Sequence, residues 1–184
     1  MGSISLVREA SVLVVIDLQP SFLKAIHESD RVVARSRFLI EAARILSVPV
    51  IATTQNRERM GGIAPELSEL LPETIDKMSF SCCGSKEFRQ ALEGSGRRLA
   101  IIVGIETHIC VSQTAQQLRG GTFEVAVCPD AVSSRSIDRH KLGMERIRDG
   151  GAIPVHSEAV VYEWLRTAED PAFREILALV KANP

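Results

Sequence analysis

The feature that most constrains the fold is a series of unbroken apolar runs separated by segments of helical pattern. The longest runs lie at residues 11–16, 99–103 and 122–127, and we predict each to be a buried strand. Strands without an alternating polar face are typical of a parallel sheet that helices cover on both sides. The sequence therefore predicts an α/β fold, a three-layer α/β/α arrangement with a mainly parallel, open, Rossmann-like sheet.

The remaining elements alternate along the chain in the same way. Shorter strands are predicted at residues 49–53, 74–78 and 152–155. Helices are predicted at 31–46, 64–71, 85–92, 111–119, 136–148, 157–165 and 171–181. The 184 residues show no repeat and no break in composition, which indicates a single domain over residues 1–184.

Composition and charge exclude some classes of binding partner for this protein. A net charge of −1 and an aromatic content of 4 % argue against a nucleic-acid partner or an anionic membrane surface. No run reaches the roughly 18 apolar residues of a membrane span, and the first residues lack a signal-peptide pattern. Four cysteines without a secretory signal predict free thiols in a reducing, cytoplasmic setting. Apolar helices near the C-terminus suggest a homo-oligomer.

Polar and nucleophilic residues follow the predicted strands. Because the carboxyl ends of parallel strands share one edge of a sheet, these residues should meet there, in the usual ligand crevice of such folds. In chain order they are Asp17, Gln55, Asn56, Lys77, Glu106, Thr107, Cys110 and Asp130.

The chemistry of three of these residues fits together. A thiol at the start of a helix has a lowered pKa, and Lys77 would favour the thiolate of Cys110 further. Asp17 could move a proton between that thiol and a leaving amine. The simpler interpretations are a turn residue for Asp17, a surface charge for Lys77 and inert packing for Cys110.

Three segments in this order resemble the isochorismatase-like cysteine hydrolases. They are residues 15–19 (VIDLQ), Lys77, and residues 104–111 (GIETHICV). Residues 130–152 are similar to the eukaryotic isochorismatase domain-containing proteins, which points to that subgroup. The resemblance covers nearly the whole chain, and the segment with Cys110 is its most specific part.

The resemblance implies an Asp17–Lys77–Cys110 triad that hydrolyses a small amide or related C–N bond through a thioester. It also implies a cis peptide between Ile105 and Glu106, which aims the Glu106 amide at an oxyanion beside the Cys110 amide. Nicotinamidases of this family bind a metal near the second strand, but residues 54–58 (TQNRE) contain no histidine, so we expect no metal and no cofactor. Isochorismatase proper lacks the cysteine, so its reaction is not expected here.

Position alone suggests which side chains contact a small-molecule substrate: Gln19, Phe22, Asn56, Phe80 and Thr107. His108 lies two positions before Cys110, which is poor spacing for a base on a helix.

Two other interpretations remain open. One is a catalytically idle oligomeric scaffold of the same fold. An ordinary pKa near 8.5 for the Cys110 thiol would favour that interpretation. The other is thiol redox chemistry, which would need Cys82, Cys83 or Cys128 to approach Cys110 by folding.

Overall fold

The computed structural model describes residues 5–183, and its centre is an open sheet in the order β3-β2-β1-β4-β5-β6. Every neighbouring pair is parallel. The strands are β1 (Ser11–Ile16), β2 (Val50–Gln55), β3 (Ile75–Lys77), β4 (Leu99–Ile105), β5 (Glu124–Ser133) and β6 (Ile153–Pro154). The predicted parallel sheet is confirmed.

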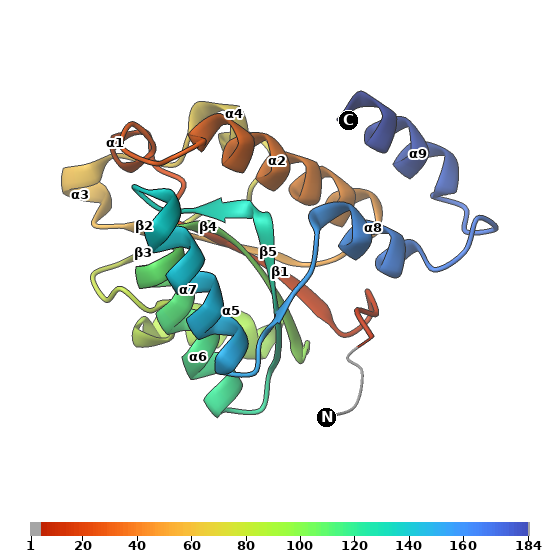
Figure 1. The fold of residues 1–184 in the computed structure, drawn as a ribbon. Helices are drawn as coiled ribbons and strands as arrows, with labels where there is room; N and C mark the ends of the chain where they lie inside the picture. The colour runs from red at the N-terminus through yellow and green to blue at the C-terminus, as the bar shows by residue number, and fades with distance from the viewer. Residues whose placement is uncertain (1–4, 184) are drawn as a thin grey trace.

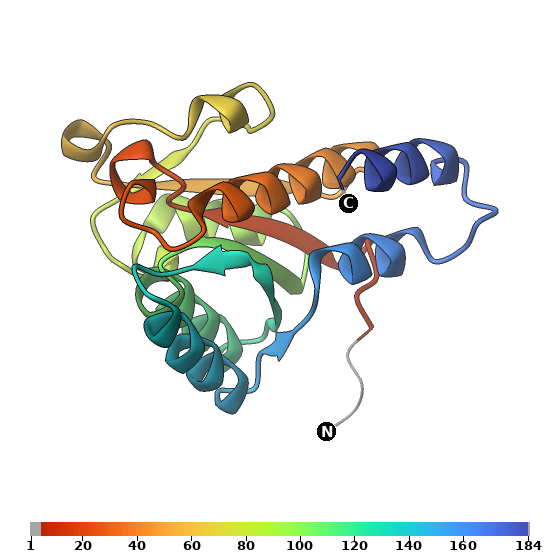
Figure 2. The same ribbon diagram turned by 45° about the horizontal axis from the view of Figure 1, so that its top comes forward.

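Helices cover both faces of this sheet (Figures 1 and 2). On one face lie α2 (Ser29–Ile45), α4 (Pro65–Ser68), α8 (Ser157–Leu165) and α9 (Phe173–Ala182), and on the other α5 (Lys86–Gly94), α6 (Ser112–Gly120) and α7 (Ile137–Asp149). Alternate residues of β1 enter the two cores: Leu13 and Val15 join the α2 side, while Val12 and Val14 join the α5 side. The three-layer α/β/α architecture is confirmed.

Short turns and helices follow the carboxyl ends of the central strands. They are α1 (Pro20–Leu23) after β1, α3 (Arg57–Met60) after β2, the 3₁₀ turn Cys82–Gly84 after β3 and the π-helical turn Thr107–Val111 after β4. Figure 1 shows α1 and α3 at the same end of the molecule. This end gathers the polar residues that follow the strands.

Two glycines allow the close packing behind this end. Gly104 pairs with Ile16 and has a φ of +115°, and a Cβ there would lie 2.1 Å from the Ile16 carbonyl oxygen. On α7, a Cβ at Gly143 would lie 2.9 Å from the Cα of His108. Only glycine therefore lets β1 approach β4, and α7 approach the turn Thr107–Val111.

Some predicted boundaries were wrong. The fifth strand continues to Ser133 because the β4–β5 register shifts between Ile102 and Gly104. Asp130 therefore lies inside β5, not beyond its end. The helix predicted at 64–71 is limited to Pro65–Ser68, and the short helix Pro20–Leu23 is not among the helices predicted from the sequence.

Candidate active site

A buried ion pair joins the ends of β1 and β3. Asp17 follows β1 directly, in a left-handed conformation with φ 54°, and is 2 % exposed. The ammonium group of Lys77, which is 3 % exposed, donates to Asp17 Oδ2 over 2.7 Å. The hydroxyl of Thr53 on β2 donates to Asp17 Oδ1 over 2.8 Å. Both carboxylate oxygens are thus held, one by a partner from β2 and one by a partner from β3.

Lys77 is fixed by further acceptors. Its ammonium nitrogen lies 2.8 Å from Gln55 Oε1 and 3.2 Å from each of the carbonyl oxygens of Ser79 and Phe80. A buried ion pair is stable only when its remaining hydrogen-bonding capacity is satisfied. Lys77 therefore has a fixed position, with its charge directed at Asp17.

Cys110 lies near this ion pair, in the turn that follows β4. It is the fourth residue of the turn Thr107–Val111, and it is 8 % exposed. It shares a cavity of about 70 Å³ with Asp17, and its thiol interacts with the Asp17 carboxyl group. The cavity is lined by Asp17, Phe22, Gln55, Phe80, Ile105, Glu106, Ile109 and Cys110. Of the three predicted triad residues, Asp17 pairs with Lys77 and lines the same cavity as Cys110.

The expected lowering of the Cys110 pKa was wrong. Burial raises the pKa of the thiol, the negative charge of Asp17 raises it further, and Lys77 only partly opposes this. Burial also raises the pKa of Asp17, against the opposing effects of Lys77 and Thr53. Burial and the charge of Asp17 thus favour the neutral thiol over the thiolate.

The peptide between Ile105 and Glu106 is cis, as the resemblance implies. Glu106 also lines the cavity, and its carboxylate pairs with the Arg135 guanidinium over 3.0 Å. The backbone N–H of Arg135 donates to the same carboxylate oxygen over 3.3 Å. The side chain of Glu106 is thereby tied to the segment after β5.

The five predicted substrate contacts fall into two groups. Phe22 and Phe80 line the cavity, whereas Gln19, Asn56 and Thr107 are not among its lining residues. Gln19 is fully buried: its side chain accepts from the Gln55 N–H over 2.6 Å and donates to the Gly61 carbonyl over 2.7 Å.

Asn56 and Thr107 also lie outside the cavity lining. Asn56 precedes α3 in a left-handed conformation. The hydroxyl of Thr107 lies 3.0 Å from His140 Nδ1. Gln19 and Thr107 thus hold the segments around the cavity in place.

His108 and Cys82, two further residues raised by the sequence, do not line the cavity. His108 Nδ1 is 3.0 Å from the Ser134 hydroxyl. Cys82 is fully buried, with its sulfur 3.8 Å from the Thr53 hydroxyl, and burial raises its pKa to about 12. All four cysteines are free thiols.

Sequence reasoning missed two residues that build the site. Gln55 lines the cavity and holds Lys77, and Thr53 holds Asp17. The sequence places Gln55 at the end of a predicted strand but indicates no role for it. The signal was the polar group Thr53, Thr54 and Gln55 at the end of an otherwise apolar buried strand.

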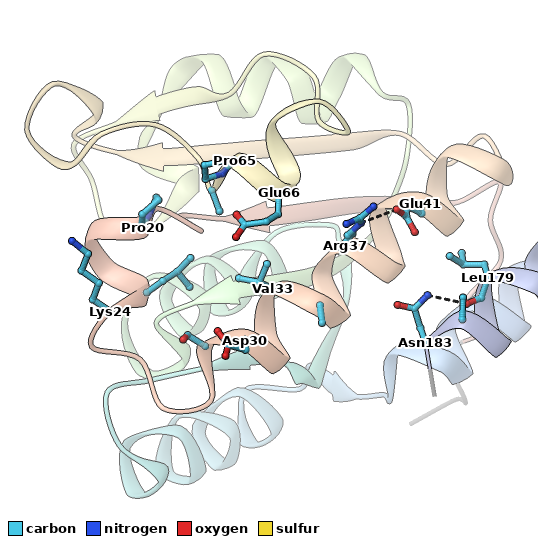
Figure 3. A pocket seen from close by; sticks show the side chains of 15 residues that line it. Pro20, Lys24, Asp30, Val33, Arg37, Glu41, Pro65, Glu66, Leu179 and Asn183 are labelled. Atoms are coloured by element: carbon cyan, nitrogen blue, oxygen red, sulfur yellow. Dashed lines mark hydrogen bonds and ion pairs between the residues drawn. The ribbon is translucent and has the colours of Figure 1, made fainter.

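A much larger hollow lies elsewhere, between α2, α4 and α9 (Figure 3). Its volume is about 900 Å³, and an Arg37–Glu41 ion pair of 2.9 Å crosses part of its wall. Its lining contains no cysteine or histidine. The small cavity, not this hollow, combines a thiol with a buried carboxyl group.

Within residues 5–183, no group of three or more His, Cys, Asp or Glu side chains is placed to hold a metal ion. In the same part of the chain, no helix has the length and apolar character needed to cross a membrane.

Comparison with known proteins gives consistent matches. The family model of the isochorismatase domain matches residues 11–159. The secreted isochorismatase effector Isc1 of Phytophthora sojae is 33 % identical over 184 aligned positions, covering 97 % of this chain and 88 % of that protein. Isochorismatase domain-containing protein 2A of Mus musculus is 32 % identical, covering 94 % of this chain and 84 % of its own length.

Solved structures agree with the observed architecture. The MAR1 ribonuclease of Caenorhabditis elegans superposes with a TM-score of 0.91 at 36 % identity, covering 97 % of this chain and 93 % of that one. The YcaC gene product of Escherichia coli, described as an octameric hydrolase of unknown specificity, gives a TM-score of 0.86 at 20 % identity, with 99 % and 98 % covered. The second match supports the fold alone.

Proposed function

Because the chain belongs to the isochorismatase family, we propose that it is a cysteine hydrolase that cleaves a small amide or a related C–N bond. One observation carries the proposal. Asp17 contacts the Lys77 ammonium over 2.7 Å and also interacts with the Cys110 thiol, and Asp17 and Cys110 line one cavity. This arrangement gives a neutral nucleophile, a base and a charge that keeps the base ionised.

The first half of the reaction forms a thioester. Asp17 accepts the thiol proton while the sulfur attacks the amide carbon, and the carbonyl electrons move onto oxygen. The backbone N–H groups of Glu106 and Cys110 stabilise this oxyanion. When the carbonyl re-forms, the C–N bond breaks, and the Asp17 carboxylic acid protonates the departing nitrogen.

The second half releases the acid. Water attacks the thioester carbon and gives a proton to Asp17, and the C–S bond then breaks. The sulfur leaves as a thiolate and regains its proton from Asp17, which restores the starting state. Lys77 holds Asp17 in position and favours its ionised form at the start of each half-reaction.

The direct test is a screen of small amides and ureas with the parent chain, Cys110→Ala and Cys83→Ala in parallel. Cys83 is the matched control because it is a partly exposed thiol that does not line the cavity. We expect Cys110→Ala to abolish turnover and Cys83→Ala to retain it, and mass spectrometry to detect an acyl group on Cys110. Full turnover by Cys110→Ala would refute the mechanism.

Assembly and location are part of the same proposal. The octameric description of the E. coli neighbour supports a homo-oligomer, which light scattering of the purified chain tests. Four free cysteines support a reducing, cytoplasmic location. The P. sojae relative is named a secreted protein, so fractionation of the native organism is the deciding measurement.

The C. elegans neighbour is named a ribonuclease, which makes RNA cleavage the activity to compare. Neither lysine nor arginine is among the residues that line the thiol's cavity, and its 70 Å³ is small for a nucleotide. We expect no cleavage of an RNA oligonucleotide under conditions in which the preferred amide is hydrolysed.

A further inference from the structure

The size of the thiol's cavity limits what can react there. A water molecule requires roughly 10–15 Å³ of such space, so about 70 Å³ holds about five to seven groups of that size. Phe80, which is 56 % exposed, stands where the cavity meets the surface. The reacting part of the substrate is therefore a short acyl amide, and anything longer must extend past Phe80.

The cavity wall is also unsuited to an anion. Its apolar residues are Phe22, Phe80, Ile105 and Ile109, against which an unpaired charge is costly to bury. Its carboxyl-bearing residues are Asp17 and Glu106, each already paired with a cation, and a carboxylate offers no hydrogen-bond donor to a second carboxylate.

The two cations near the wall are already engaged. The three protons of the Lys77 ammonium face four acceptors: Asp17, Gln55 and the carbonyl groups of Ser79 and Phe80. Arg135 does not line the cavity, and its guanidinium pairs with Glu106 over 3.0 Å. A substrate carboxylate would thus meet two acidic residues and no uncommitted ammonium group in the cavity.

We propose that this site selects uncharged short-chain amides and rejects those that carry a carboxylate beside the scissile group. The proposal rests on the hydrolase function, because the selected group is the acyl part that Cys110 would receive. Charge selectivity at the thiol can nevertheless be measured without any turnover.

The first experiment compares alkylation of Cys110 by iodoacetamide and by iodoacetate, which have similar size and differ in charge. In both reactions the S–C bond forms as the C–I bond breaks, iodide leaves, and the thiol proton goes to Asp17 or solvent. Peptide mapping gives the rate at Cys110, and N-acetylcysteine gives the ratio for an unhindered thiol. We expect the iodoacetamide-to-iodoacetate ratio at Cys110 to be at least about tenfold larger than for N-acetylcysteine. Equal ratios would overturn the proposal.

Two variants identify the groups responsible. Glu106→Gln keeps the backbone amide and removes one negative charge, so we expect the ratio to fall. Arg135→Gln leaves Glu106 without its partner, so we expect the ratio to rise. If Arg135 instead receives the carboxylate, the parent chain will favour iodoacetate and Arg135→Gln will abolish that preference, which would also overturn the proposal.

The second experiment uses turnover of isovaleramide and of malonamate, which has a carboxylate in place of the terminal isopropyl group. We expect isovaleramide to be hydrolysed at least about tenfold faster. Faster hydrolysis of malonamate would overturn the charge selectivity while leaving the hydrolase intact. Selective alkylation without hydrolysis of any amide would refute the hydrolase while leaving the selectivity of the cavity supported.

Discussion

Two aspartates of the parallel sheet region, one after β1 and one within β5, have different hydrogen-bond partners. Asp17 follows β1 and meets the Lys77 ammonium, the Thr53 hydroxyl and a thiol. Asp130, within β5, accepts hydrogen bonds from the backbone N–H and the hydroxyl of Ser157, the first residue of α8. The first carboxylate faces a cavity, and the second stabilises the positive end of a helix.

The difference shows that a carboxylate with several hydrogen-bond partners does not by itself indicate catalysis. The carboxyl groups of Asp17 and Asp130 each have several partners, and the identity of those partners decides what each carboxyl group can do. Asp130 also lies 4.0 Å from the Arg35 guanidinium and 3.4 Å from His156, so a nearby basic group does not by itself separate the two acids. A cavity shared with a thiol makes Asp17 a candidate base, whereas hydrogen bonds from a helix start make Asp130 a structural cap.

Substitution of Asp17 and of Asp130 should differ most in its effect on catalysis. Asp17→Asn keeps the size of the side chain and an oxygen for Lys77, but it cannot accept the thiol proton. We expect kcat/KM for the best amide of the screen to fall by about 10²–10⁴-fold. Asp130→Asn is the matched control and should retain the parent rate. Similar losses in the two variants would break the distinction.

The second largest expected effect is a shift in the pH dependence of Cys110 alkylation. Because burial and the negative charge of Asp17 raise the thiol pKa, the rate with iodoacetamide should still be rising above pH 8.5, the ordinary thiol value. Asp17→Asn removes that charge, which lowers the thiol pKa and moves the profile to lower pH. A plateau below neutral pH in the parent chain, or identical profiles for both chains, would contradict this.

The smallest expected effect is on stability. Asp130→Ala removes the acceptor for the Ser157 N–H, so the free energy of unfolding should fall by about 0.5–2 kcal/mol. Trp164, the one tryptophan of the chain, is buried in α8, and its fluorescence reports urea unfolding of that helix. Amide turnover should be unchanged. An unaltered unfolding midpoint would remove the capping role of Asp130.

Much of the fold and the centre of the candidate site could be predicted from the sequence. Apolar runs without alternation identify buried parallel strands, and the carboxyl ends of such strands place Asp17, Lys77 and Cys110 at one edge. Those inferences need only local pattern and one rule of topology.

The remaining features depend on tertiary packing. The extension of β5 follows from a register shift against β4, which no local signal marks, and it changes the position of Asp130. The pKa of Cys110 depends on the depth of burial and on the nearby Asp17. The role of Gln55 requires knowing that Lys77 lies 2.8 Å away.

Gly104 has a consequence for engineering the specificity of this protein. Any side chain there would collide with the Ile16 backbone and push β1 away from β4, which would separate Asp17 from Cys110. Mutant libraries aimed at new substrates should therefore keep this position constant and randomise Phe22 and Phe80, which line the cavity and lie outside the strands.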